Sequence, residues 1–160
     1  MDRRVAMLRT SAALIVLDQL GKLMARGALV GLDTLAVIPG VLHLTAVENT
    51  GSLFGSLPGQ NLLLTLLSVG VSGALCWLIL SGRAPEDRLG RVAMVLLLAG
   101  AMGNLVDRLL RGAVFDFIDF QIWPVFNFAD AMLSTGVGAL LLRELRTLRG
   151  PRAPSGSRSS

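Results

Sequence analysis

Charged side chains are scarce in this sequence, and several stretches contain none. Asp, Glu, Lys and Arg make up 16% of the 160 residues, whereas hydrophobic residues make up 52% and the mean hydropathy is +0.64. A soluble surface does not tolerate such a composition, so it excludes an ordinary soluble enzyme and indicates an integral membrane protein. The length predicts one compact unit.

Histidine and cysteine occur once each, as His43 and Cys76. A lone cysteine cannot form an internal disulfide, and we expect Cys76, inside an apolar run, to be a packing residue. One histidine without an H-E-x-x-H pair does not predict a zinc hydrolase. His43 also has no recognisable serine or cysteine nucleophile motif around it, which disfavours those catalytic schemes.

Four apolar runs predict four transmembrane helices, at about residues 10–30, 60–80, 92–111 and 126–142. The second run has no charge over 21 residues, which is enough to cross about 30 Å of hydrocarbon at about 1.5 Å per residue. The first run follows a basic segment, as in a secretory signal peptide, but charged residues interrupt it and no small-residue cleavage site follows. We therefore predict one membrane domain over residues 1–149. Residues 150–160, rich in Gly, Pro and Ser, are predicted to be a disordered cytoplasmic tail.

The segment between the first two runs has a different pattern. Residues 31–59 contain two short patches rich in β-branched and apolar residues, Leu35–Ile38 and Val41–Val47, with turn signals at Pro39-Gly40 and Asn49–Gly51. Such alternation predicts short extended segments. At about thirty residues the segment is too long for a mere connector, and we predict a small sheet lying on the membrane surface.

Basic residues are distributed asymmetrically about the predicted helices. Residues 27–59 and 112–126 contain none. By the positive-inside rule both termini are predicted to be cytoplasmic, with these two loops outside. The bases lie beside apolar runs, so nucleic acid is not an expected partner. Those on the predicted cytoplasmic side are Arg3, Arg4, Arg9, Arg83, Arg88, Arg91, Arg143, Arg146, Arg149, Arg152 and Arg158. The four that break the pattern, and are expected to have anionic partners, are Lys22, Arg26, Arg108 and Arg111.

Two polar groups of residues interrupt the apolar helices. Asp18 and Lys22 are spaced i, i+4, so they lie on one helix face as a mutually neutralising pair or as part of a site between helices. Asn104, Asp107 and Arg108 are spaced i, i+3, i+4 and also share a face. They predict either a structural hydrogen-bond network or a surface that holds a substrate carbonyl or a lipid headgroup.

The acids Asp116 and Asp130 follow the third run and open the fourth. Consecutive antiparallel helices can bring them to one membrane depth, where paired carboxyls share a proton. One can then act as a base on water and the other as an acid. Two alternatives stand beside this. Asp130 can belong to a capping box that begins at Asn127, and Asp116 and Asp119 can be solvated loop acids. Asp119 is also an alternative member of the pair.

Four segments resemble the bacterial lipoprotein signal peptidase (signal peptidase II) family of intramembrane aspartic proteases. They occur in the family's order and span most of the chain. The segments are LDQLGK with Asp18 and Lys22, ENTGSLFG with Asn49 and Gly51, GNLVDRLLRGAVFDFIDF over 103–120, and FNFADA over 126–131. The chain departs from the family pattern at Ser52-Leu53, where the family has two alanines.

The resemblance implies an all-α membrane protein. Its four-helix transmembrane bundle would carry a small extracytoplasmic β-like cradle between helices one and two. It implies that Asp116 and Asp130 are the catalytic pair. It also implies a substrate-binding or supporting polar network of Asp18, Lys22, Asn49, Gly51, Asn104, Asp107, Arg108 and Asn127.

The implied reaction is removal of the signal peptide from a diacylglyceryl-modified prolipoprotein, by cleavage before the lipidated cysteine. No metal or organic cofactor is implied. The expected partners are this lipid-modified substrate and membrane lipids, and the expected state is a monomer. The expected location is the bacterial cytoplasmic (inner) membrane, with the active site near the outer face. Small residues, namely Gly100, Gly103, Gly136 and Gly138, predict close helix approach.

Two other functions fit parts of the pattern. A small proton-coupled transporter could use the buried acids as a relay, and a non-catalytic membrane subunit could use them to register helices. A relay predicts ionisable residues throughout the membrane depth. Here they concentrate in the outer half, which favours catalysis at the interface.

Overall fold

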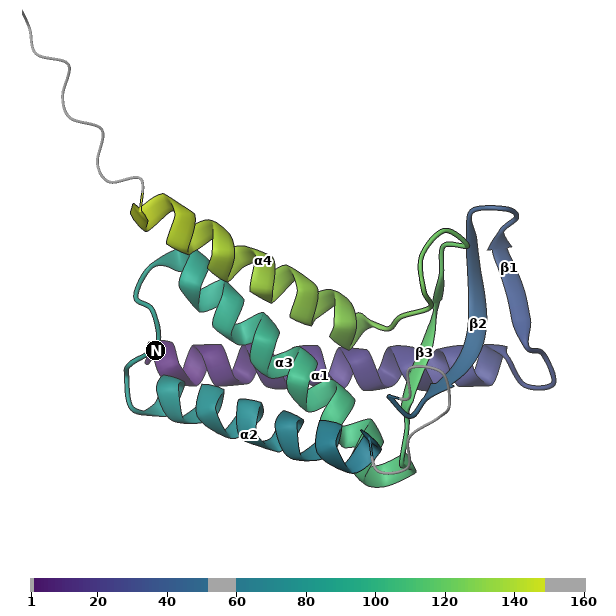
Figure 1. The fold of residues 1–160 in the computed structure, drawn as a ribbon, viewed down its shortest axis with the longest axis horizontal. Coiled ribbons are helices and arrows are strands. Elements are labelled where there is room, and N and C mark those ends of the chain that lie inside the picture. Colours follow the sequence, from purple (N-terminus) through teal and green to yellow (C-terminus); the bar gives the residue numbers. More distant parts are fainter. Residues whose placement is uncertain (1, 52–59, 149–160) are drawn as a thin grey trace, which may run out of the picture.

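The computed structural model describes residues 2–51 and 60–148, and they form four helices and one small sheet (Figure 1). This confirms the mostly helical fold with four helices. The helices are α1 (Arg3–Ala28), α2 (Gln60–Leu80), α3 (Arg88–Arg111) and α4 (Phe128–Leu148). The predicted tail at 150–160 and the Ser52-Leu53 departure lie outside the described residues.

The helices extend beyond the apolar runs because polar residues cap them. Asp2 accepts a hydrogen bond from the Arg4 backbone N–H at 3.0 Å, so α1 begins seven residues before the predicted start at residue 10. Asp87 accepts one from Gly90 N–H at 2.8 Å and begins α3. A side-chain acceptor at this position satisfies an amide that the helix itself leaves unpaired. Of the helices, α2 and α3 are long and apolar enough to cross a membrane.

Helix α3 is the central element of the bundle. It packs against α1, α2 and α4, whereas α1 and α4 have little contact with each other. A Cβ added at Gly100 would lie 2.5 Å from the Ala129 carbonyl oxygen, and one at Gly136 would lie 2.8 Å from Leu97 Cγ. Gly103 is equally confined, since its Cβ would lie 2.8 Å from Asp18 Oδ2. The predicted close approach is therefore confirmed at these three positions.

Gly138 does not take part in this packing. Apart from its own helix backbone and chain neighbours, no atom of the described residues would lie within 4 Å of a Cβ added there. The prediction for this residue was wrong, because Gly138 is two positions after Gly136 and therefore points away from α3.

The sheet stands across the end of the bundle opposite the start of the chain (Figure 1). Its strands are β1 (Thr34–Ile38), β2 (Leu42–Asn49) and β3 (Val114–Asp119), antiparallel and in the order β1-β2-β3. The first two agree with the predicted extended segments. The third comes from the loop between α3 and α4. We had expected the cradle to be built only from the segment between helices one and two, and this expectation was wrong for β3.

Strand β3 reaches the sheet because α3 ends sharply. Gly112 has φ of 78°, the left-handed conformation that favours glycine, and its N–H donates to the Arg108 carbonyl. The register then pairs Val47 with Asp116 and Asn49 with Val114. This pairing places Asp116 beside the end of β2, next to the chain that leaves the sheet.

Candidate active site

Lys22 lies at the centre of the buried polar residues. Its side chain is 1% exposed. Its ammonium lies 2.8 Å from Asp18 Oδ2, 2.8 Å from Asp107 Oδ2 and 3.3 Å from Asn104 Oδ1. An ammonium has three N–H donors, so these three acceptors satisfy it completely. The predicted Asp18–Lys22 pair is therefore present and extends to α3.

Asp18 connects this cluster to the start of α4. Its second oxygen, Oδ1, accepts a hydrogen bond from the Ala129 N–H at 2.9 Å. The amides of a helix's first turn need such an acceptor, and a negative charge there is favourable. One buried acid on α1 thus holds the turn of α4 that carries Asp130.

Asp107 is bound on both oxygens. Arg111, one turn later on α3, donates to Oδ1 at 2.8 Å, and the Phe115 N–H donates to Oδ2 at 3.3 Å. Phe115 precedes Asp116 in β3, so Asp107 also positions that strand. Lys22 and Arg111 carry two positive charges, and Asp18 and Asp107 carry two negative charges. The cluster is neutral.

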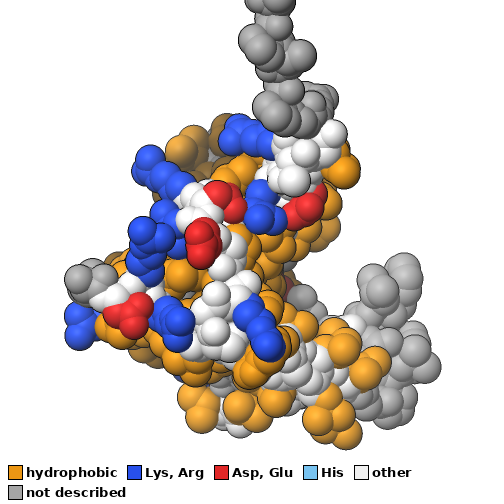
Figure 2. Space-filling model, turned by 90° about the vertical axis from the view of Figure 1, so that its left-hand side faces the viewer, with side chains coloured by type: hydrophobic (Ala, Val, Ile, Leu, Met, Phe, Trp, Pro, Cys, Tyr) orange, Lys and Arg blue, Asp and Glu red, His pale blue; other side chains and the backbone are white. Residues whose placement is uncertain are grey.

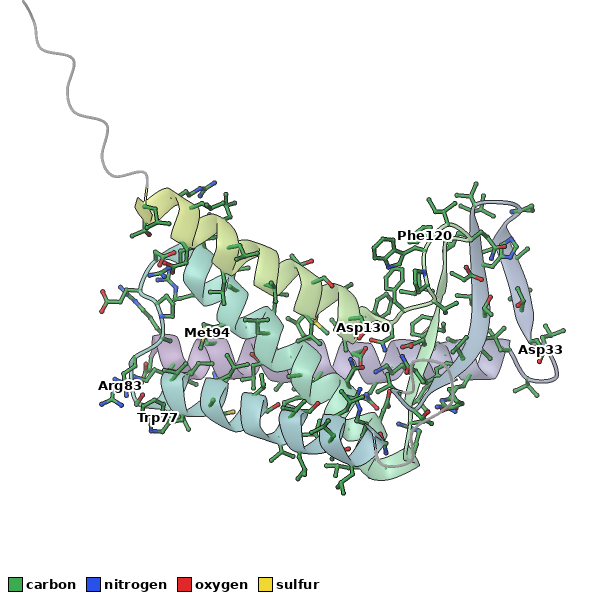
Figure 3. The ribbon with its side chains drawn as sticks, in the orientation of Figure 1. Asp33, Trp77, Arg83, Met94, Phe120 and Asp130 are labelled. Atoms are coloured by element: carbon green, nitrogen blue, oxygen red, sulfur yellow. The ribbon has the colours of Figure 1, made fainter. Side chains whose placement is uncertain are left out.

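Asn104 and Asn127 join this cluster to Asp116 and Asp130. Asn104 Nδ2 donates to Asp130 Oδ1 at 2.7 Å, and its Oδ1 accepts from Asn127 Nδ2 at 3.2 Å. Asn127 Nδ2 also donates to Asp116 Oδ1 at 2.6 Å, and its backbone N–H donates to Asp130 Oδ2 at 3.2 Å. Asn127 therefore contacts both carboxyls, and Figure 3 shows Asp130 at the end of α4 that faces the sheet.

The capping box predicted at Asn127 is also present. Asp130 N–H donates to Asn127 Oδ1 at 3.0 Å, while the Asn127 N–H donates back to the Asp130 carboxylate. The capping role and a role in the site are thus compatible. The cap fixes the direction of the Asp130 side chain relative to Asp116.

Asp116 is a buried carboxyl that forms no salt bridge with any of the described cationic side chains. It is 2% exposed, and its second oxygen accepts a hydrogen bond from Asn49 Nδ2 at 2.9 Å. Burial, helped by the negative charge of Asp130, raises the pKa of Asp116 to about 6, against the lowering effect of the Asn49 and Asn127 amides and of the Lys22 charge. Near neutral pH this group can therefore either hold or release a proton.

Asn49 is held in place by the turn that follows it. The Gly51 N–H donates to Asn49 Oδ1 at 2.8 Å, and Gly51 has φ of 78°. A side-chain amide held at its oxygen presents its N–H groups in one direction, here toward Asp116. The structure thus brings both predicted residues to the site, with Gly51 acting through Asn49.

Asp119, the alternative partner, has a different environment. It accepts hydrogen bonds from Thr45 Oγ1 at 2.8 Å and from the backbone and side chain of Gln121 at 2.8 and 2.6 Å. These bonds, led by that of the Gln121 N–H, hold the pKa of Asp119 below its usual value. Among the described residues none of these partners is an asparagine of the site, and its contacts are those of a carboxylate that stabilises a turn.

Arg108 lies beside the site without a salt bridge to any described acid. It is half-buried, and its Nη1 donates to Ser68 on α2 at 3.4 Å. It lines a cavity of about 270 Å³ together with Asn104 and Asp130. Within the described range no acid lies at salt-bridge distance from Arg108, but its charge interacts with those of Asp130, Asp116 and Asp107 from farther away. Lys22 and Arg111 form the expected ion pairs, and Arg26 pairs with Glu48 at 2.9 Å.

We did not predict two sets of contacts at the site from the sequence. Asp107 and Arg111 are spaced i, i+4, the same signal that identified Asp18 and Lys22. Gln19 donates to Asp18 Oδ2 and to the Gly103 carbonyl, both at 3.1 Å. No spacing rule reveals Gln19, because one partner is its immediate neighbour Asp18 and the other, the Gly103 carbonyl, lies on a helix far away in the sequence.

Comparisons with known proteins find a family to which most of the chain is similar. A family model described as signal peptidase (SPase) II matches residues 10–146. The lipoprotein signal peptidase of Moorella thermoacetica is 45% identical over 130 residues, which cover 78% of this chain and 84% of the relative. That of Halothermothrix orenii is 38% identical over 128 residues, which cover 80% of this chain and 87% of the relative.

Two solved structures have a similar fold. One described as a bacterial membrane enzyme, determined by the in meso method at 2.3 Å resolution, superposes with a TM-score of 0.78. It is 29% identical, and the match covers 94% of each chain. A second of the same description has a TM-score of 0.76 at 30% identity, over 88% of this chain and 93% of that one.

Replacing Lys22 tests the buried cluster. Lys22→Met leaves Asp18 and Asp107 buried without the cation between them, and breaking a buried pair in this way costs about 3–5 kcal/mol. We expect the free energy of unfolding, measured by chemical denaturation in detergent, to fall by that amount. Lys22→Met/Asp18→Asn should recover part of the loss, because it removes one uncompensated charge.

The matched control is Arg143→Gln, which breaks the exposed pair with Asp87 at 2.6 Å. An exposed pair contributes about 1 kcal/mol or less. If Lys22→Met were as stable as Arg143→Gln, the cluster would not hold the helices together.

Proposed function

This chain belongs to the signal peptidase II family, and we propose that Asp116 and Asp130 perform its chemistry. It is an aspartic endopeptidase that removes signal peptides from prolipoproteins, cleaving before the lipid-modified cysteine. The observation that carries the assignment is the position of Asn127, whose side-chain amide donates to Asp116 at 2.6 Å and whose backbone N–H donates to Asp130 at 3.2 Å. One residue therefore orients both carboxyls.

The two acids would divide the proton transfers between them. We assign the proton to Asp116 in the active form of the enzyme, because burial raises its pKa to about 6 and the carboxyl is neutral below that pH. Asp130 is then the carboxylate that removes a proton from water as the water attacks the scissile carbonyl carbon. Asp116 gives its proton to the carbonyl oxygen, so no oxyanion has to exist unprotected in an apolar site.

Collapse of the resulting gem-diol completes the hydrolysis. The C–N bond breaks, the proton held by Asp130 passes to the leaving amine of the lipidated cysteine, and Asp116 recovers its proton from the diol. Each group ends in the state in which it began. The buried Lys22 cluster takes no part in these transfers, because all three of its ammonium N–H groups have acceptors.

The charge asymmetry and the position of the site support a specific placement in the membrane. We propose that all four helices cross the bacterial inner membrane as one domain, with both termini cytoplasmic and the sheet on the outer face. The carboxyl pair then lies at the level where a lipid anchor would hold the peptide bond of the substrate. The proposed partners are the prolipoprotein and membrane lipids, and the proposed state is a monomer.

The supporting residues have separate roles in this proposal. Asn49, Asn104 and Asn127 orient the carboxyls through neutral amides, while Asp18, Lys22 and Asp107 hold the helices. Arg108 lies in the cavity with Asp130 and has one buried nitrogen, Nε, without a described partner. That cavity is the space through which a substrate backbone would approach Asp130.

Substitution of each acid by its amide tests the pair. Asp116→Asn and Asp130→Asn should each lower cleavage of a purified lipid-modified precursor by about 10²–10⁴-fold or more, the range expected for loss of a general acid or base. Folding is checked by thermal unfolding of the same preparations. Asp119→Asn is the matched control on the same strand and should keep activity of the same order as the wild type. Full cleavage by either dyad variant would refute the assignment.

The raised pKa of Asp116 predicts the pH dependence. Below about pH 6 the carboxyl is neutral, and above it the carboxyl is ionised, so the enzyme loses its acid as the pH rises. We expect kcat/KM, which reports the free enzyme, to fall as the pH rises through about 6. We expect kcat to fall only at higher pH, because a bound lipid substrate buries Asp116 further and so raises its pKa.

Asn49→Ala provides the second arm of this test. It removes an amide that lowers the pKa of Asp116, so the alkaline limb of kcat/KM should move to higher pH. A kcat/KM that is constant between about pH 5 and 8, or that rises across this range, would contradict the assignment of the proton to Asp116.

A further inference from the structure

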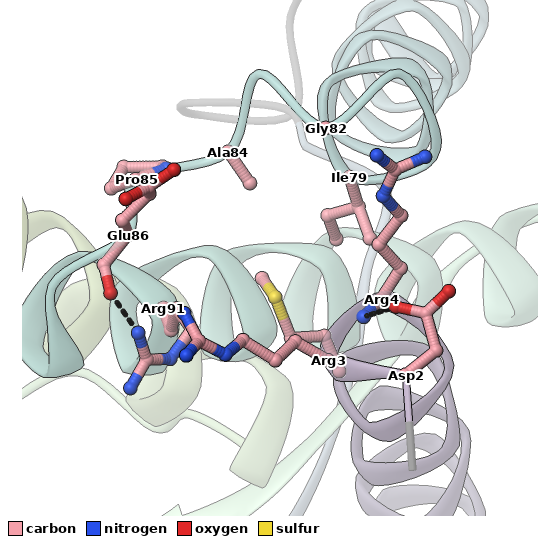
Figure 4. A pocket seen from close by; sticks show the side chains of 10 residues that line it. Asp2, Arg3, Arg4, Ile79, Gly82, Ala84, Pro85, Glu86 and Arg91 are labelled. Carbon is pink, nitrogen blue, oxygen red and sulfur yellow. Dashed lines mark hydrogen bonds between the residues drawn. The ribbon is translucent and has the colours of Figure 1, made fainter.

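Two arginines meet at the end of the bundle where α1 begins, an end at which basic side chains gather (Figure 2). Arg3 and Arg91 stand in the first turns of α1 and α3, and both line the same two cavities. Figure 4 shows their side chains extending toward one another. Arg91 donates to the Glu86 backbone carbonyl, but neither arginine forms a salt bridge with a described acid. Two like charges placed together in this way favour a bound anion.

The first cavity has a volume of about 310 Å³ and also contains Arg4, Asp2 and Glu86. Asp2 is occupied in capping α1 through the Arg4 N–H, and Arg4 Nη1 donates to the Leu80 carbonyl at 2.8 Å. Three arginines and two acids give the lining a net charge of +1. The cavity therefore attracts an anion even with both acids ionised.

The second cavity, of about 350 Å³, runs from the arginine pair along the groove between α1 and α3. Arg3 and Arg91 are its only ionisable lining residues among those described, and Thr10 is its only other polar side chain. Leu14 and Leu96 also line a third cavity of about 610 Å³ between α1, α3 and α4. An almost wholly apolar groove thus runs from the arginine pair at the start of α1 to the level of Asp18 in the bundle.

We propose that this groove binds one anionic phospholipid, with its phosphate on Arg3 and Arg91 and one acyl chain along the second and third cavities. Guanidinium groups recognise phosphate oxygens through paired N–H donors. The apolar walls provide the surface that an acyl chain needs. At the end of the bundle that we assign to the cytoplasm, anionic headgroups are available in the adjoining leaflet.

Charge distinguishes this occupant from the signal helix of a substrate. A signal peptide begins with a positively charged region on the cytoplasmic side, which Arg3 and Arg91 would repel. Free phosphate would satisfy the arginines but leave the apolar groove without an occupant. The inference rests on the membrane location of the chain and not on the assignment of Asp116 and Asp130.

The test compares two pairs of substitutions that remove the same charge from the same end. In Arg3→Gln/Arg91→Gln the arginines of the cavities are lost. In Arg88→Gln/Arg146→Gln two exposed arginines are lost that line none of the three cavities. Binding of dioleoylphosphatidylglycerol to the full chain in a zwitterionic detergent is measured by native mass spectrometry.

The Kd should rise about 30-fold in the first variant, since each basic residue near a lipid surface contributes about 1 kcal/mol. It should change by about twofold or less in the second. An equal loss in both variants would show that binding depends on diffuse charge, and no loss in the first would show that the arginines are not the site. Either result overturns the proposal.

Two further measurements examine the groove itself. Thr10→Phe, which fills the second cavity without a change in charge, should weaken lipid binding, with Val92→Phe on the opposite wall as the second variant. Inorganic phosphate should not compete with the lipid at equal concentration. Effective competition would identify a simple anion site instead.

Cleavage kinetics show whether a lipid or the signal helix of the substrate occupies the groove. Arg3→Gln/Arg91→Gln should leave KM for the precursor unchanged in zwitterionic detergent, and a change in KM would place the signal helix in the groove and overturn the proposal. Asp116→Asn should bind the lipid normally. This last arm keeps a failure of the lipid site distinct from a failure of the catalytic assignment.

Discussion

The contacts of the buried Lys22 ammonium determine how the helices are arranged. The ammonium ties α1 to α3 through Asp107 and Asn104, and its partner Asp18 holds the first turn of α4 by the Ala129 N–H. A buried charge is costly unless every donor is satisfied, and here all three are. The same few contacts therefore determine where the helix that carries Asp130 begins.

The charged residues that hold the helices together are distinct from the two acids that we propose as the catalytic pair. Two cations and two acids neutralise one another around Lys22, so Asp116 and Asp130 are held by the neutral amides of Asn49, Asn104 and Asn127 instead of by salt bridges. A cation in contact with Asp116 would keep it ionised and remove the acid. Amides orient the carboxyl, while burial keeps its pKa raised to about 6.

Features that depend on local spacing could be predicted from the sequence. They include the four helices, which follow from continuous apolar runs, and the Asp18–Lys22 pair and the cap at Asn127, which follow from contacts within one helical turn. The addition of β3 to the sheet could not be predicted, since it depends on strand pairing between segments about seventy residues apart. Spacing also could not choose between Asp116 and Asp119. The family resemblance favoured Asp116, and the structure shows why the two differ: their hydrogen-bond partners are amides of the site in one case and a turn in the other.

A titration of the carboxyl groups, by NMR of the chain labelled with ¹³C at aspartate side chains, measures the coupling of the two acids without reference to any substrate. In the wild type the Asp116 resonance should titrate near pH 6, and in Asp130→Asn at lower pH, because the neighbouring negative charge is gone. Burial is the larger cause of the shift, so the value should still exceed the ordinary 3.8. An Asp116 titration that the substitution at Asp130 leaves unchanged would show that the two carboxyls do not act as a pair.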